Sequence, residues 1–190
     1  MKAVQLEANK HLKISEISIP KVNPDECLIN IKVCGVCSSD IYRAFENGAY
    51  FYPLIMGHEI SGQIIEIGEK IKNFKVGDSV SVFPLLPCFT CNSCKEKKYA
   101  TCENYKYYGS RNSGGFSEYI VVNADALLRI PKEMDAVTAA GFTMTYGTSM
   151  YALKQRGCLK SGEKLLVLGA GGGVGITAVE IGKLMGAEVI

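Results

Sequence analysis

Four cysteines lie close together near the middle of the chain, in a stretch with little apolar periodicity, at Cys88, Cys91, Cys94 and Cys102. Tetrahedral Zn²⁺ prefers soft ligands from closely spaced loop positions, and four protein ligands leave no open coordination position. An iron–sulfur cluster is the alternative, but the ferredoxin run has three residues before its last cysteine, where this chain has seven. The spacing therefore predicts a structural zinc lobe over residues 84–104.

A second group of candidate metal ligands comes earlier in the chain. Cys37 follows Gly35-Val36, and His58-Glu59 come about 20 residues later, at the start of a predicted strand. A histidine beside a glutamate is by itself more often a hydrogen-bonded structural pair than a ligand set. Cys34 and Cys37 would also fit a redox pair, but no thioredoxin-like unit surrounds them.

A glycine-rich turn follows the apolar run Leu165–Leu168 and precedes a predicted helix over Val174–Met185. Glycines let the backbone approach a pyrophosphate, whose charge is met by the helix N-terminus. The spacing is looser than GxGxxG, so a plain strand-to-helix junction is an alternative. The candidate NAD or NADP contacts are Gly169, Gly171, Gly172, Gly173, Val174 and Gly175. The residue that selects between the two cofactors would lie about 20 positions past Gly169, where this sequence ends.

The elements that position these residues divide the chain into a β-rich half and a half with βαβ order. Segments rich in Val and Ile, separated by turn residues, predict strands at Lys2–Glu7, Leu12–Ile19, Cys27–Val33, Ile60–Ile67 and Ser79–Phe83. A short helix is expected at Ser39–Glu46, with Ser38 or Ser39 as its N-cap.

In the second half, apolar residues at helical spacing predict helices over Asp135–Gly141 and Thr145–Gln155. A buried strand at Leu165–Leu168, the glycine turn, a helix and a last strand at Glu188–Ile190 follow. This order implies a parallel sheet covered by helices. We therefore predict a mixed β and α/β fold, with a β-rich domain at 1–135 and the start of a doubly wound domain at 136–190. We expect the sequence to be the front part of a longer protein, because such a domain needs more strands.

Charge and composition exclude several classes of protein. The 21 Lys and Arg residues against 19 Asp and Glu residues give a net charge of +2, which disfavours nucleic acid as a partner. No apolar run reaches the roughly 18 residues of a membrane helix, and the first residues are too polar for a secretory signal. We expect a cytoplasmic protein with reduced thiols and no membrane partner.

Taken together, six motifs occur in the order typical of one family: Gly35-Val36-Cys37-x2-Asp40, Gly57-His58-Glu59, Phe74–Val80, the cysteine lobe, Gly114–Tyr119 and the glycine turn. The whole chain thus resembles the zinc-containing medium-chain alcohol dehydrogenases. The resemblance implies a GroES-like catalytic domain followed by a Rossmann domain, and an enzyme that moves hydride between an alcohol or carbonyl substrate and NAD or NADP. It also implies a homo-oligomer at full length.

The resemblance assigns roles to individual residues. Cys37 and His58 match two catalytic zinc ligands, and Glu59 matches an acidic neighbour that approaches the metal in exchange for water. Asp40 matches a carboxylate that orients the histidine, a role that metal sites generally require. Ser39 matches the hydroxyl that passes the alcohol proton outward.

One departure from the family leaves alternatives open. The third family ligand is Cys, Asp or Glu in the segment matching Ala140–Thr145, which holds none of these here. The stretch Ala139-Ala140-x4-Thr145-Tyr146-Gly147-Thr148 is instead similar to the zinc-free quinone oxidoreductase and enoyl reductase branch. Glu59 is the best substitute ligand, although residues 58 and 59 would point to opposite sides of an ideal strand, so a bend at Gly57-His58 is required. The alternatives are a quinone or enoyl reductase, and a non-catalytic zinc-binding scaffold.

Overall fold

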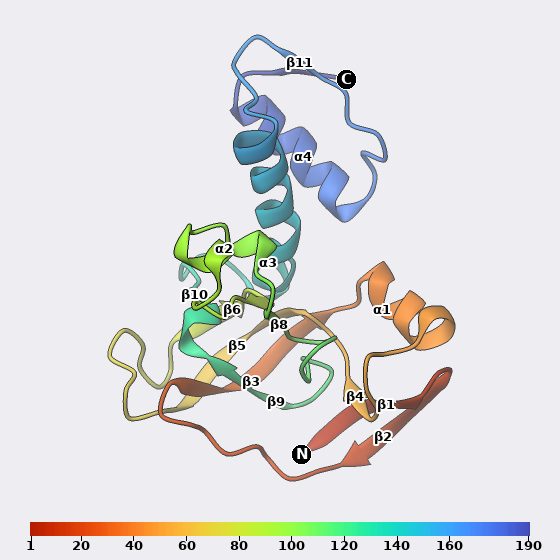
Figure 1. Ribbon diagram of the computed structural model, residues 1–190, viewed down its shortest axis with the longest axis vertical. Coiled ribbons are helices and arrows are strands. Elements are labelled where there is room, and N and C mark those ends of the chain that lie inside the picture. The colour runs from red at the N-terminus through yellow and green to blue at the C-terminus, as the bar shows by residue number, and fades with distance from the viewer. The chain divides into compact units, whose positions relative to one another are not determined.

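A computed structural model describes residues 1–190 of the protein (Figure 1). The chain forms two compact units, Met1–Ala140 and Gly141–Ile190. None of its helices is long and apolar enough to cross a membrane.

The first unit is built on a five-stranded antiparallel sheet with the strand order β10-β6-β5-β3-β9. Its strands are β3 (Glu26–Gly35), β5 (Glu59–Ile67), β6 (Ser79–Val82), β9 (Tyr119–Asn123) and β10 (Leu127–Arg129). Side chains from all of these strands share one core, because apolar residues recur on one face of each strand. Fully buried members include Cys27, Ile29, Ile60, Ile64, Val80, Val82 and Val122.

A smaller sheet pairs β2 (His11–Glu16) with β1 (Lys2–Ala8), and β1 in turn with β4 (Leu54–Ile55). Its core is formed by Leu6, Ala44, Leu54 and Met56. Ala44 belongs to the short helical segment that consists of α1 (Ser38–Tyr42) and one π-helical turn (Arg43–Asn47). The predicted helix is therefore present, but its N-cap is Cys37 rather than a serine.

The cysteine-rich segment lies between two very short strands, β7 (Leu85–Leu86) and β8 (Lys106–Tyr107), which pair as an antiparallel hairpin stem. Between them the chain makes only α2 (Asn92–Lys95) and a 3₁₀ turn (Tyr99–Thr101). A second 3₁₀ turn (Ala124–Ala126) connects β9 to β10.

The second unit contains a βαβ arrangement. The helix α3 (Ala136–Met150) enters it and continues as a π-helical segment (Tyr151–Arg156). The strands β11 (Lys164–Leu165) and β12 (Glu188–Val189) are parallel, and α4 (Gly173–Leu184) connects them. The buried hydroxyls of Ser149 and Thr177, 2.7 Å apart, connect α3 to α4.

Two details of the second unit differ from the sequence-based expectation. One continuous helix replaces the two predicted segments, since Gly141 is tolerated inside α3. The predicted buried strand Leu165–Leu168 is wrong: β11 ends at Leu165, and Leu166 and Leu168 are 63% and 84% exposed. An apolar parallel strand is buried only when neighbouring elements cover both of its faces. The two-stranded sheet β11-β12 has too few such neighbours.

Candidate active site and metal centres

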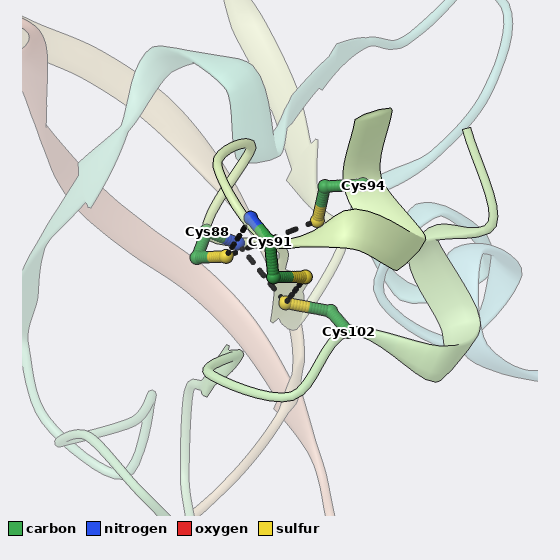
Figure 2. Close-up of side chains that lie close together, drawn as sticks. All are labelled: Cys88, Cys91, Cys94 and Cys102. Atoms are coloured by element: carbon green, nitrogen blue, oxygen red, sulfur yellow. Dashed lines mark hydrogen bonds between the residues drawn. The ribbon is translucent and has the colours of Figure 1, made fainter. Parts of the chain in front are cut away.

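The four lobe cysteines turn their sulfur atoms toward one point, as Figure 2 shows. The four Sγ atoms lie within 4.8 Å of one another. The Sγ atoms of Cys88 and Cys94 are 3.9 Å apart, and so are those of Cys91 and Cys102. In a tetrahedral site with Zn–S bonds of about 2.3 Å, the sulfurs are about 3.8 Å apart. The geometry of the lobe therefore fits a four-thiolate zinc ion.

Backbone N–H groups stabilise charge on these sulfurs. The N–H groups of Cys88 and Cys91 donate to Cys102 Sγ and Cys88 Sγ, at 3.2 and 3.4 Å. Hydrogen bonds from the Thr90 hydroxyl and from backbone N–H groups lower the pKa of Cys88 to about 5. Thiolate is the form that binds metal, so these hydrogen bonds favour the binding form at Cys88. At Cys94, by contrast, burial raises the pKa to about 12.

The backbone of the lobe is held in an uncommon conformation. Phe89 and Lys97 adopt φ angles of 58° and 59°, the left-handed region that costs a non-glycine residue energy. Apart from a ring contact between Phe89 and Tyr99, little apolar packing is present here to maintain that geometry. A metal that fixes all four cysteines would maintain it.

The second group of ligands assembles from two segments of the chain, the start of α1 and the start of β5. Cys37 caps α1, His58 precedes β5, and Glu59 is the first residue of β5. Their ligand atoms lie within 4.8 Å of one another. The structure thus brings together the three residues that the sequence singled out as the second metal group.

Asp40 organises this group through both of its carboxylate oxygens. Oδ2 accepts a hydrogen bond from the backbone N–H of Cys37 at 3.1 Å, and Oδ1 lies 3.4 Å from Nδ1 of His58. Asp40 and His58 are almost completely buried, and these facing Oδ1 and Nδ1 atoms have no closer partner. Burial acts to lower the pKa of His58, but Asp40 and Cys37 outweigh it and hold that pKa above its ordinary value. With Nδ1 turned toward Asp40, Nε2 is the nitrogen left for a metal.

Gly35 makes room for the Glu59 carboxylate. The two residues are directly paired between β3 and β5, and a Cβ atom at position 35 would overlap the carboxylate of Glu59. Because position 35 has no side chain, the carboxylate can lie across the neighbouring strand toward Cys37. This explains physically why a glycine stands two residues before the cysteine.

The bend that the ligand pair 58–59 requires is present at Gly57, whose φ is +87°. This left-handed conformation is accessible mainly to glycine, and it places His58 outside the regular strand. The segment of Gly114–Phe116 fixes the bend, because the N–H groups of Gly115 and Phe116 donate to the carbonyls of Gly57 and Met56, both at 2.9 Å. His58 and Glu59 can therefore serve one site.

Ser39 lies on the first turn of α1, next to Cys37. Burial would raise the pKa of the Cys37 thiol, but hydrogen bonds from the side chain and backbone of Ser39, and from His58, hold it below its ordinary value. A thiolate at this position is a suitable metal ligand.

Sequence reasoning missed two neighbours of this cluster. The ring of Tyr107 lies 5.8 Å from that of His58. The guanidinium of Arg43 donates from Nη1 to the carbonyl of Ser39 at 3.3 Å. In the sequence, only the four-residue spacing of Ser39 and Arg43 on one predicted helix indicated that these two residues are neighbours.

The glycine turn of the second unit has the conformation expected of a tight strand-to-helix junction. Gly169 has a φ of +73°, and a Cβ at Gly175 would overlap the carbonyl of Gly169. Gly172 is the N-cap of α4, and its carbonyl accepts from Ile176 at 2.8 Å. Gly171, Gly173 and Val174 are exposed in the turn and first helical turn, where backbone N–H groups can meet a phosphate.

Comparison with known proteins identifies a family and several similar dehydrogenases and reductases. The family profile described as the alcohol dehydrogenase GroES-like domain matches residues 23–132. Galactitol 1-phosphate 5-dehydrogenase of Escherichia coli K12 is 36% identical over 192 residues, which cover 100% of this chain and 54% of the relative. Acryloyl-coenzyme A reductase of Sulfurisphaera tokodaii is 34% identical over 194 residues, which cover 100% of this chain and 58% of the relative.

A similar solved structure is that of a cobalt- and zinc-bound thermostable alcohol dehydrogenase from Pyrobaculum aerophilum. It is 31% identical, has a TM-score of 0.87, and the match covers 98% of this chain and 58% of that one. The chain therefore spans somewhat more than half the length of the proteins it matches.

Proposed function

Because the chain belongs to the alcohol dehydrogenase GroES-like domain family, we propose that it is part of a zinc-dependent, NAD(P)-linked oxidoreductase that interconverts an alcohol and an aldehyde or ketone. The observation that carries the proposal is the meeting of Cys37, His58 and Glu59 within 4.8 Å. Sulfur, nitrogen and oxygen donors of this kind suit Zn²⁺, and three of them leave a position open for a substrate oxygen.

The residues around this group have matching roles in the proposed chemistry. Zinc bound here would supply Lewis-acid chemistry that lowers the pKa of an alcohol. Asp40 orients the His58 ring and fixes its tautomer. The hydroxyl of Ser39, beside Cys37, takes up the substrate proton and passes it outward. Cys88, Cys91, Cys94 and Cys102 hold a second, structural zinc.

The hydride acceptor in this proposal is NAD or NADP. The turn from Gly169 to Gly175 binds the pyrophosphate through backbone N–H groups at the start of α4. In the same proposal, residues 1–135 form the catalytic domain and residues 136–190 open the cofactor domain. We further propose that the full-length protein is a homo-oligomer in the cytoplasm. The unpaired thiols suit such a reducing compartment.

A second candidate function is the NADPH-dependent reduction of a conjugated carbon–carbon double bond, as in quinone and enoyl reductases. Two observations favour it. The segment 140–145 offers no Cys, His, Asp or Glu, and one relative is named acryloyl-coenzyme A reductase.

Metal analysis of the full-length protein, combined with His58→Ala, separates the two functions. The proposal expects two zinc ions per chain in the parent and one in the variant, with alcohol oxidation lost. One zinc per chain in the parent, and an unchanged rate of enone reduction with NADPH in the variant, would establish the second function instead. Cys158→Ser is the matched control, because this exposed thiol lies outside both ligand groups.

A further inference from the structure

Two buried hydroxyl groups lie where α3 meets the first turn of α4, within the second unit. Ser149 and Thr177 are only 1% and 5% exposed. Ser149 Oγ lies 2.9 Å from the carbonyl oxygen of Val174 and 2.7 Å from Thr177 Oγ1. Thr177 Oγ1 lies 3.1 Å from the carbonyl oxygen of Thr145, which belongs to α3. The hydroxyl pair is therefore bonded to both helices.

The hydroxyl pair joins the two helices whichever way its hydrogens point. Each hydroxyl has one hydrogen to donate. Both acceptors printed by the geometry for Ser149, the carbonyl of Val174 and Oγ1 of Thr177, belong to α4. A buried hydroxyl that lost its partner would carry the full cost of its desolvation. The pair thus holds the first turn of α4 in one position on α3.

The carbonyls that the hydroxyl pair contacts belong to the peptide groups that would meet an anion. Thr177 Oγ1 lies 3.0 Å from the carbonyl oxygen of Val174 and 3.3 Å from that of Gly173. A peptide group is planar, so its C=O and its N–H move together. Holding these two carbonyls therefore also holds the N–H groups of Val174 and Gly175. Both N–H groups lie in the first turn of α4, where a helix makes no bonds to its own N–H groups.

The N-terminal end of α4 is left free for an anion. Its N-cap is Gly172, no side chain caps the helix, and its first turn holds no acidic residue. Uncapped N–H groups need an acceptor from elsewhere, and the helix dipole favours a negatively charged one. A phosphate group provides both the acceptor oxygens and the charge.

The glycine turn is packed where it meets α3 and open at its tip. A Cβ at Gly173 would lie 3.2 Å from the side chain of Thr145, whereas a Cβ at Gly171 would meet no atom within 4 Å. Glycine populates many backbone conformations, so a turn rich in glycine needs a contact that selects one of them. The hydroxyl pair provides such a contact on the packed side and leaves the open side to a ligand.

We propose that Ser149 and Thr177 are positioning residues for the cofactor, which hold the N–H groups of α4 ready for the pyrophosphate of NAD or NADP. This inference rests on the proposed oxidoreductase function and concerns only its cofactor site. A turn that adopts the binding conformation for only part of the time binds with an affinity reduced by that fraction. The pair therefore strengthens cofactor binding without touching the cofactor.

Nucleotide binding to the full-length protein tests the inference. Thr177→Val removes the hydroxyl and keeps the shape of the side chain. The Kd for NADH or NADPH, whichever the parent binds more tightly, should rise by about 3- to 10-fold, the effect of about one buried hydrogen bond. Nucleotide fluorescence measures it. The KM for the cofactor should rise with the Kd, while kcat stays near the parent value. Thr177→Ser retains a hydroxyl and should recover most of the affinity.

The matched control is Thr148→Val, which makes the same change at an exposed position of α3 and should leave the Kd unchanged. Ser149→Ala removes the other hydroxyl and serves as the test variant if Thr177→Val does not fold. The variant with both substitutions should bind the nucleotide little more weakly than either single variant, because residues that act as one unit are not additive.

A lower midpoint of unfolding with an unchanged Kd would mean that the pair only stabilises the fold, and would overturn the inference. An equal loss of affinity in Thr177→Val and Thr177→Ser would overturn it too. The proposed function fails separately. A Kd that depends on the pair, in a protein that oxidises no alcohol, would keep the inference and reject the alcohol dehydrogenase function. Alcohol oxidation with parent-like nucleotide affinity in both Thr177→Val and Ser149→Ala would do the reverse.

Discussion

The ring of Tyr107 lies 5.8 Å from the ring of His58 and is tilted by 59° to it. Tyr107 is also the last residue of β8, half of the hairpin stem from which the cysteine lobe projects. Its backbone pairs with Leu85, three residues before Cys88. One residue therefore joins the lobe to the candidate catalytic zinc ligand.

Replacing Tyr107 tests this connection. Tyr107→Ala removes the ring beside His58 and is expected to lower kcat/KM of the full-length enzyme about 10-fold, since a misplaced catalytic group costs rate. Tyr107→Phe keeps the ring and should recover most of the loss. Zinc content should stay at the parent value in both variants. Equal rates for the alanine and phenylalanine variants would show that the ring contact has no positioning role.

Removing one lobe cysteine tests the structural zinc site. Cys91→Ser should lower the zinc content by about one ion per chain. It should reduce the free energy of unfolding by more than about 4 kcal/mol, because loss of a structural metal is among the largest single-residue effects. Metal analysis and denaturant unfolding measure both quantities, with Cys158→Ser as the control. An unchanged zinc content would rule out the four-thiolate site.

The carboxylate of Asp40 should tune the affinity of the second metal site. Asp40→Asn keeps the shape of the side chain but weakens its interaction with Nδ1 of His58. Changes of this kind cost 10- to 100-fold in metal affinity, and the lobe zinc should be unaffected. Competition with a chelator of known affinity measures the loss. Parent-like affinity in the variant would mean that Asp40 acts only as a cap of α1.

A methyl group at position 35 should displace the Glu59 carboxylate. Gly35→Ala introduces a Cβ that overlaps it, and overpacking of this kind costs about 1–3 kcal/mol. We expect loss of one zinc ion per chain and of alcohol oxidation. Gly141→Ala is the matched control: it meets open space inside α3 and should stabilise the helix by about 0.5–1 kcal/mol. A Gly35→Ala variant that still binds two zinc ions would exclude Glu59 as a ligand.

Asp78 should make the stability of the first unit dependent on pH. A hydrogen bond from Arg129 at 2.9 Å opposes the effect of burial and, with the backbone N–H of Lys75, lowers the pKa of Asp78. A lowered folded-state pKa means that the stabilisation is fully present above the unfolded-state value of about 3.9 and is lost as the pH falls through the folded-state value.

Denaturant unfolding of the parent and of Asp78→Asn checks this expectation. The variant should be less stable at pH 7, and the difference between the two proteins should shrink as the pH falls below about 4. A difference that stays constant or grows toward acid pH would contradict the assignment.

Several strands, the four-cysteine group and the family could be predicted from residue types and their spacing. The strands β1, β3, β5 and β6 were predicted to within a few residues, because alternation of apolar residues is a local property of the sequence. The sequence also predicted that four cysteines form one group, because ligands in a loop of only 15 residues remain close in space; they are Cys88, Cys91, Cys94 and Cys102. The resemblance to medium-chain alcohol dehydrogenases was confirmed by the family match over residues 23–132.

Other features were decided only by the tertiary structure. The strands β4, β7 and β8 have two residues each, too few for any periodicity to appear. Tyr107 could not be recognised as a neighbour of His58, since their proximity depends on how the hairpin stem and the Gly114–Phe116 segment fold back on Gly57. The sequence named Glu59 as a candidate ligand, but only the pairing with Gly35 and the left-handed φ of Gly57 bring its carboxylate to Cys37. Contacts between distant residues follow from the packing of whole sheets, and no local pattern encodes that packing.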